Sequence, residues 1–185
     1  MDAVSPYDAG TRHIHLLLAL FGIAALISGQ FADDYRRAAH KGFDIHRWIG
    51  LGMAIALALR IVWGFAGPPA VRFCQWVPFT LHRLVMVLQD LRSLLALRLP
   101  VREEHQGLAG LIQAIGLAAF FWMAASGTLM WFYLEPGTRA TGWLHTVKEL
   151  HEGGPPVAIA YVAIHVGAVL VHSLAGHPVW RRMAP

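Results

Sequence analysis

Four long apolar runs constrain this chain more than any other feature of its sequence. Each approaches or exceeds the ~20 helical residues that cross the hydrocarbon core of a bilayer. Of all residues, 56% are hydrophobic and only 14% are charged, whereas about 25% of a soluble domain is charged. Glycine and alanine recur within the runs, as expected where membrane helices pack closely. The sequence therefore predicts an all-α, integral membrane four-helix bundle in a single domain, 1–185. The predicted spans are about 13–32, 45–66, 108–134 and 155–176.

A further apolar segment, residues 79–99, is predicted to form a helix that lies in the membrane interface and does not cross. Leucines recur in it at helical spacing, which gives the helix one apolar face. If the segment crossed the bilayer, four charged side chains would enter it, each at a cost of about 2.5–3.5 kcal/mol. Those side chains are Arg83, Asp90, Arg92 and Arg98.

Four spans place both termini on the same side of the membrane. Eight basic residues fall on that side: Arg12, Arg72, Arg83, Arg92, Arg98, Arg102, Arg181 and Arg182. Six fall on the other: Arg36, Arg37, Lys41, Arg47, Arg139 and Lys148. Because cytoplasmic loops carry the excess of Lys and Arg, both termini are predicted to face the cytoplasm. The basic residues are scattered along the chain, so nucleic acid is not expected as a partner.

Histidines lie at membrane depth in two matched pairs. With both termini cytoplasmic, His15 and His165 lie toward the cytoplasmic face, whereas His46 and His151 lie near the outer face. In a helix, the separation of His151 and His165 corresponds to about 21 Å of rise and returns to nearly the same face. A lone membrane histidine more often forms an interhelical hydrogen bond. Two pairs matched in depth instead predict two stacked cofactor sites in the bundle core.

The ligand set selects among the metals that imidazole binds, which are zinc, copper and iron. Zinc normally needs three or four protein ligands, and no cysteine or carboxylate lies at membrane depth to complete such a set. Two imidazoles across an apolar slot suit a six-coordinate haem iron. Cys74 is the single cysteine, so attachment of haem through a Cys-x-x-Cys-His motif is excluded. Arg60, inside the second run, is expected either to pair with a haem propionate or to snorkel to the headgroups.

Several motifs resemble the bacterial cytochrome b561 and Ni-Fe hydrogenase b-type cytochrome superfamily, whose members are di-haem four-helix membrane proteins. "RHIHLLLAL" is similar to the start of the family's first helix, and "HRWIGLGMAIALALRIVWGFAGPPAVRF" is similar to its second. "HQGLAGL", "LHEGGPPVAIAYVAIH" and "VWRRMAP" are similar to later parts, so the resemblance covers most of the chain. It implies two non-covalent b haems whose iron ligands are His15, His46, His151 and His165.

One segment departs from the family pattern, because "GGPP" at residues 153–156 interrupts what is commonly a continuous helix. Proline is tolerated in the first turn of a helix but breaks its interior. His151 is therefore expected on a loop or on a preceding helix, and His145 is an alternative ligand. His172 is expected either to support a ligand or to line a quinone pocket. The remaining positions expected in loops or at the interface are His40, His82 and His105.

The resemblance implies electron transfer between the quinone pool and a redox partner protein, either a dehydrogenase or hydrogenase subunit or a c-type cytochrome. A stand-alone superoxide:quinone oxidoreductase is the alternative within the same family. A haem-free membrane anchor or assembly subunit is the alternative from another class. The chain shows no nucleophile–base pair, phosphate loop or paired carboxylates, so no catalytic residue is predicted.

Overall fold

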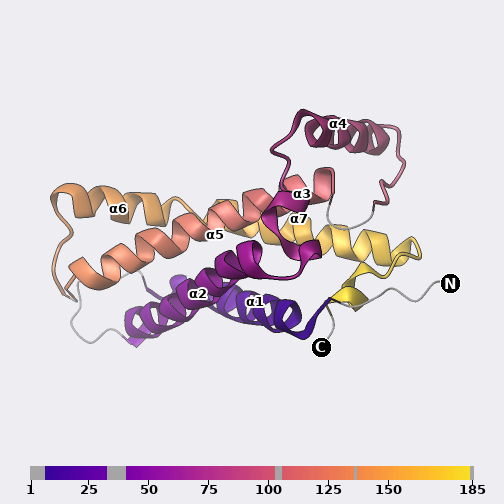
Figure 1. The fold of residues 1–185 in the computed structure, drawn as a ribbon. Helices are drawn as coiled ribbons and strands as arrows, with labels where there is room; N and C mark the ends of the chain where they lie inside the picture. Colours follow the sequence, from indigo (N-terminus) through magenta and orange to yellow (C-terminus); the bar gives the residue numbers. More distant parts are fainter. Residues whose placement is uncertain (1–6, 33–40, 103–105, 136, 184–185) are drawn as a thin grey trace. The chain divides into compact units, whose positions relative to one another are not determined.

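The computed structural model describes residues 7–32, 41–102, 106–135 and 137–183. Over these residues the chain is helical and contains no strand, which confirms the all-α prediction. The long helices are α1 (Ala9–Gly29), α2 (Lys41–Ala66), α5 (Leu108–Tyr133) and α7 (Pro155–Leu174), and Figure 1 shows them along the chain. The short elements are η1 (Pro69–Val71), α3 (Phe73–Trp76), α4 (Leu81–Leu95), α6 (Gly142–Glu152) and η2 (Val179–Arg182). Arg36, Arg37, His40 and His105 lie outside the described residues.

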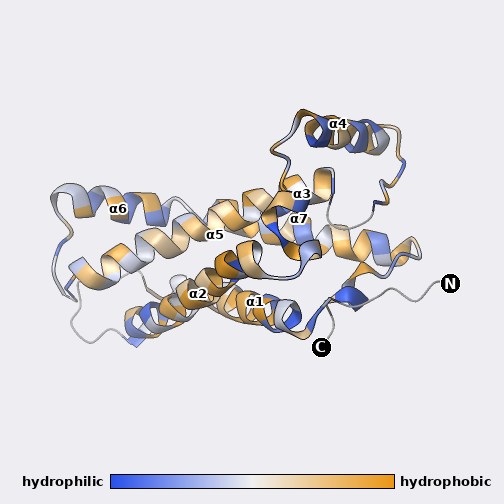
Figure 2. Cartoon of the chain, viewed as in Figure 1, coloured by the Kyte–Doolittle hydropathy of each residue, from blue (hydrophilic) through white to orange (hydrophobic). Residues whose placement is uncertain are grey.

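Four helical segments are long and apolar enough to cross a membrane, which confirms the four predicted spans. Three of them are α1, α2 and α5, and the fourth, Gly142–Leu174, takes α6 and α7 together. Figure 2 shows that apolar residues dominate the long helices, whereas α4 and α6 mix apolar and polar residues. Few residues in each span are buried, and outward-facing side chains such as Leu20, Ile27 and Val62 are exposed and apolar. Such surfaces suit contact with lipid, so the chain is a multi-pass membrane protein.

The described chain divides into two compact units. Unit 1 comprises Met1–Arg12, Ile61–Leu117 and Tyr161–Pro185, and unit 2 comprises His13–Arg60 and Ala118–Ala160. The boundaries fall inside the four long helices. The prediction of a single domain is not tested by this division and stays a prediction.

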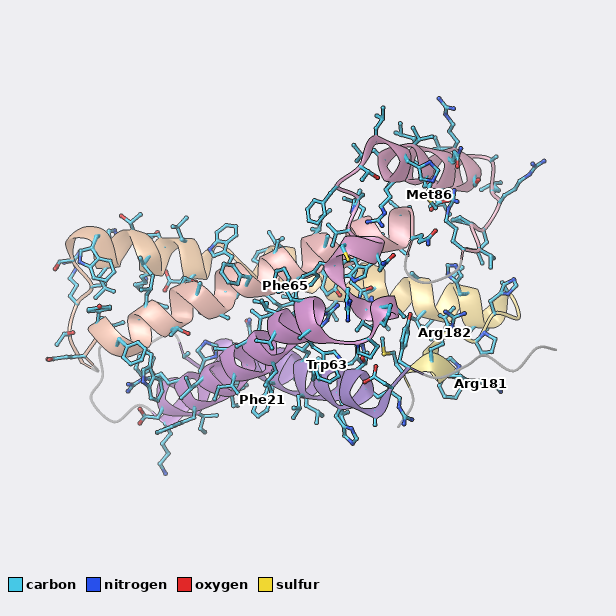
Figure 3. The ribbon with its side chains drawn as sticks, in the orientation of Figure 1. Phe21, Trp63, Phe65, Met86, Arg181 and Arg182 are labelled. Atoms are coloured by element: carbon cyan, nitrogen blue, oxygen red, sulfur yellow. The ribbon has the colours of Figure 1, made fainter. Side chains whose placement is uncertain are left out.

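In unit 1, a hydrogen-bonded network connects the start of α1 to α2. Asp8 caps α1, because its carboxylate accepts the backbone N–H of Thr11 at 3.0 Å and the Thr11 hydroxyl at 2.5 Å. The indole N–H of Trp63, labelled on α2 in Figure 3, donates to the Thr11 hydroxyl oxygen at 3.0 Å. A Cβ added at Gly10 would lie 2.7 Å from the Trp63 ring, so the small residue permits the close approach.

The segment predicted to lie in the interface forms α4 in unit 1, and it is not among the membrane-spanning helices. Thr80 caps its start by accepting the backbone N–H of Arg83. Leu84, Leu88 and Leu91 on this helix are exposed, whereas Val87 is buried. Figure 3 labels Met86 on this helix. The position of α4 in the membrane interface stays a prediction.

Asp90, one of the charged side chains of α4, is buried within the protein. The residue is only 3% exposed. Its carboxylate accepts the Arg102 Nε–H at 2.5 Å and the backbone N–H of Leu108 at 2.8 Å. Burial is tolerated because the charge is both paired and hydrogen-bonded. Gly107 permits this arrangement, since its φ is +64° and a Cβ there would overlap the Asp90 carboxylate.

In unit 2, the "GGPP" segment separates α6 from α7. Gly153 follows the last residue of α6, and Pro155 begins α7, where its missing N–H has no helical partner to lose. A Cβ at Gly154 would overlap the side chain of Met123 on α5. The break therefore lies against α5, and His151 lies in the last turn of α6, on a helix that precedes the fourth apolar run.

Candidate functional site

Unit 2 contains a cavity of about 580 Å³. This volume is within the range of about 300–1,000 Å³ found for small-molecule and cofactor sites. Its walls come from α1, α2, α5, α6 and the first turns of α7. The lining is mainly apolar and includes Leu26, Met53, Phe120, Met123 and Ile159. Such walls exclude water and lower the local dielectric constant, which suits a large apolar cofactor.

Two imidazoles line this cavity, those of His46 on α2 and His151 on α6. Their ring centroids are 6.1 Å apart and their planes are inclined at 67°. Metal–imidazole bonds are about 2.0–2.1 Å long in zinc proteins, so this separation leaves room for one metal atom between the two rings. We call this pair the His46–His151 site.

Each of the two rings is hydrogen-bonded to a serine on a long helix. The Ser28 hydroxyl on α1 lies 3.1 Å from His46 Nδ1, and the Ser126 hydroxyl on α5 lies 2.9 Å from His151 Nδ1. Each serine is only 7% exposed. Both imidazoles are therefore oriented by buried hydrogen bonds and do not hang freely in the cavity.

Glycines leave the space that the rings and the cavity occupy. A Cβ at Gly29 would lie 3.5 Å from His46 Cε1, and one at Gly127 would lie 3.1 Å from His151 Cε1. Gly50 on α2 also lines the cavity, and a Cβ there would meet no atom within 4 Å. A side chain at position 50 would therefore occupy part of the cavity.

Charged side chains lie in the cavity lining close to the first turns of α2 and the last turn of α5. The Arg47 guanidinium lies 4.5 Å from the Trp131 ring centroid and 3.8 Å from a carboxylate oxygen of Asp44. Lys148 on α6 pairs with Glu152 at 2.5 Å. Arg47, Lys148 and Glu152 all line the cavity. Two cations thus lie beside an apolar cavity, each next to a carboxylate of its own helix.

The structure places the other predicted site residues on the expected helices. His15 on α1 and Arg60 on α2 are half-buried in unit 2. His165 on α7 belongs to unit 1, where its ring stacks on that of Tyr161 at 5.6 Å and 27°. Gly116 on α5 makes room for the Tyr161 ring, since a Cβ there would overlap it. The structure brings His46 and His151 together, whereas the pairing of His15 with His165 stays a prediction.

The competing histidines have other surroundings. His145 on α6 does not line the cavity; its side chain is 59% exposed and lies 3.7 Å from a carboxylate oxygen of Glu149. In unit 1, the two ring nitrogens of His172 face the backbone carbonyls of Ala168 at 2.9 Å and Pro100 at 3.2 Å. These contacts connect α7 to the segment that precedes α5.

Sequence reasoning missed Ser28, Ser126, Arg47 and Lys148. One signal for the serines was present, because a Ser-Gly dipeptide occurs at 28–29 and again at 126–127. In both dipeptides the serine hydroxyl contacts a histidine Nδ1 and the glycine faces the same ring. The two cations were counted only as loop charges, although both line the cavity.

The fold and the cavity define a class of protein, namely a membrane helix bundle with an apolar, histidine-lined cofactor site. The sequence profile of the prokaryotic cytochrome b561 family matches residues 6–185, so the chain belongs to that family. It is a membrane b-type cytochrome that binds b-type haem and takes part in electron transfer. No curated protein and no solved structure matches the chain.

The residues of the His46–His151 site fit a b haem. The cavity is large and mainly apolar, the imidazoles are spaced for one metal atom, and Gly50 leaves the wall open. Among the described residues, no group of three or more His, Cys, Asp or Glu side chains could hold a metal ion. The donor set here is a pair of imidazoles, which is the set that a six-coordinate haem iron takes from a protein.

Proposed function

We propose that this protein is a di-haem b-type cytochrome that transfers electrons between the quinone pool and a redox partner. The partner would be a dehydrogenase or hydrogenase subunit or a c-type cytochrome. One observation carries the proposal: the ring centroids of His46 and His151 lie 6.1 Å apart within an apolar cavity of about 580 Å³. When bound, b haem supplies one-electron oxidation and reduction at its iron.

The residues of the His46–His151 site have distinct roles in this proposal. His46 and His151 would be the two axial ligands. Arg47 and Lys148 would hold the propionate carboxylates, because both line the cavity and carry positive charge. The Trp131 ring positions the Arg47 guanidinium by a cation–π contact at 4.5 Å. The apolar walls keep water from the iron and thereby help to set its reduction potential.

A second b haem would be held by His15 and His165, with Arg60 as the partner of a propionate. The support for this site is the matched depth of the two histidines in the sequence and the resemblance to di-haem cytochromes. With both termini in the cytoplasm of a bacterial cell, this site would lie toward the cytoplasm and the His46–His151 site toward the outer face. Electrons could then cross most of the bilayer between a quinone and the partner.

Haem stoichiometry tests the ligand assignment. The purified protein should give two b haems per chain by pyridine haemochrome analysis, and its reduced-minus-oxidised spectrum should be that of low-spin b haem. His151→Ala and His46→Ala should each retain one haem. His145→Ala is the matched control on the same helix as His151, and it should retain both. If His145→Ala loses a haem while His151→Ala keeps two, the ligand is misassigned.

Topology needs its own measurement. Reporter fusions after Leu99 and after Pro185 should both report a cytoplasmic location, because residues 79–99 are predicted not to cross. Opposite locations for the two fusions would show that this segment crosses, and the depth matching of the histidines would then be wrong.

A further inference from the structure

Ser28 and Ser126 make equivalent contacts with the two histidines of the cavity. Ser28 is the penultimate residue of α1 and contacts His46 on α2, and Ser126 lies on α5 and contacts His151 on α6. In both cases the oxygen approaches Nδ1, at 3.1 Å and 2.9 Å. The contacts bridge residues 18 and 25 positions apart in the chain, so they depend on the packing of the helices.

The direction of both hydrogen bonds follows from the other partners of the serines. The Ser28 hydroxyl donates to the Ala25 carbonyl at 3.2 Å, and that of Ser126 donates to the Trp122 carbonyl at 2.7 Å. A serine has a single O–H hydrogen, so only its lone pairs remain for the imidazole. With the hydroxyl hydrogen directed to the carbonyl, each histidine donates from Nδ1–H to the serine oxygen.

Donation from Nδ1–H also decides which ring nitrogen is left for a metal. A neutral ring that carries its proton on Nδ1 has its lone pair on Nε2, which is the nitrogen left to bind a metal.

We infer that Ser28 and Ser126 are positioning residues for the haem ligands of the His46–His151 site. Each serine fixes the Nδ1–H tautomer and the ring orientation of its histidine, so that Nε2 is presented to iron. The glycine that follows each serine lies beside Cε1 of the same ring: a Cβ would come within 3.1 Å of it at Gly127, which is tight, and within 3.5 Å at Gly29, which is an ordinary contact. This inference rests on the proposed function, since it requires a haem between the two rings.

The hydrogen bonds should affect both haem affinity and reduction potential. An acceptor at Nδ1–H raises the basicity of the ligand nitrogen. Removal of such a partner typically lowers metal affinity by about 10- to 100-fold. A more basic ligand favours the ferric ion over the ferrous ion. Loss of either serine should therefore weaken haem retention and move the midpoint potential of this haem in the positive direction.

The test uses the full-length protein loaded with haem. Ser28→Ala and Ser126→Ala should each raise the midpoint potential of one of the two haems in a redox titration. They should also release that haem about 10- to 100-fold more readily to an excess of apomyoglobin. Ser28→Thr and Ser126→Thr keep the hydroxyl and should behave as the wild type does.

Ser173→Ala is the matched control. The Ser173 hydroxyl also donates to a carbonyl of its own helix, that of Val169 at 2.7 Å on α7, but it does not line the cavity. This variant should leave both potentials and haem retention unchanged. If the Ser28→Ala and Ser126→Ala variants match it, the inference is overturned. It is also overturned if the threonine variants shift as far as the alanine variants, because packing would then explain the effect.

The ligand variants separate this inference from the proposed function. If His151→Ala loses a haem while Ser126→Ala keeps the wild-type potential and retention, the haem site stands and the role of the serines is wrong. If His151→Ala retains two haems, the ligand assignment itself fails.

Discussion

The Asp90 carboxylate accepts the backbone N–H of Leu108 at 2.8 Å, so a side chain of α4 caps the first turn of α5. The same carboxylate pairs with Arg102 at 2.5 Å. One buried group thus connects the short amphipathic helix, the following loop and a membrane-spanning helix, all within unit 1. Removal of the Asp90 carboxylate should weaken the packing of these three segments against one another.

Asp90→Ala should destabilise the protein by about 2–4 kcal/mol, because it leaves the Arg102 Nε–H and the Leu108 N–H without their acceptor. The measurement is the apparent melting temperature in detergent. Glu149→Ala is a suitable control, since that carboxylate is 60% exposed on α6 and contacts its partners only at 3.7 and 3.8 Å. An unchanged melting temperature for Asp90→Ala would contradict the proposed connection.

Gly107→Ala should be more destabilising than Gly142→Ala. Both glycines have positive φ angles, +64° and +56°, so alanine is strained at either position. A Cβ at Gly107 would also overlap the Asp90 carboxylate, whereas one at Gly142 would meet nothing within 4 Å. We expect a loss of about 1 kcal/mol from strain alone at Gly142 and a clearly larger loss at Gly107, measured as melting temperatures. Equal losses would show that backbone strain, not the fit of Asp90, requires the glycine.

Asp8 should make the stability of unit 1 depend on pH. Burial alone raises the pKa of this carboxyl, but the hydrogen bonds from the Thr11 side chain and backbone outweigh it, so the pKa lies below its ordinary value of 3.8. A group whose pKa is lowered by folding stabilises the protein above the unfolded value, and that stabilisation is lost as the pH falls through the folded value. Wild type should therefore melt above Asp8→Asn at neutral pH. The difference should close as the pH falls below 3.8. If the difference in melting temperature between wild type and Asp8→Asn stays constant over this range, the charge of Asp8 does not cause the stabilisation.

Gly50→Leu should remove the haem of the His46–His151 site and leave the other haem in place. The new side chain would enter the cavity and would not strain the fold, because a Cβ at this position meets no atom within 4 Å. Haem content per chain and a redox titration measure the effect. Gly167→Leu is the matched control, since that glycine of α7 also faces open space but does not line the cavity. If Gly50→Leu binds as much haem as Gly167→Leu does, the cavity is not the haem site.

The spans could be predicted from the sequence because hydrocarbon requires long apolar helices, and that requirement is local in the chain. The helix break before Pro155 was also visible, since proline acts on its own turn. The partners of Asp90 could not be predicted, because Arg102 and Leu108 lie outside its helix and give no local signal. Ser28 and Ser126 were missed for the same reason, since a buried serine in an apolar run looks like ordinary helix packing until its contact with a distant histidine is known.

The break between α6 and α7 has a consequence for how the sequence can diverge. His151 faces the cavity from a helix of 11 residues, and Trp143, His145 and Glu149 of the same helix are exposed. Because Gly153 and Gly154 separate this helix from α7, insertions or substitutions on its exposed side need not shift the membrane span that follows. Substitutions on the exposed side of α6 should therefore be tolerated better than a substitution of His151 on the side that faces the cavity.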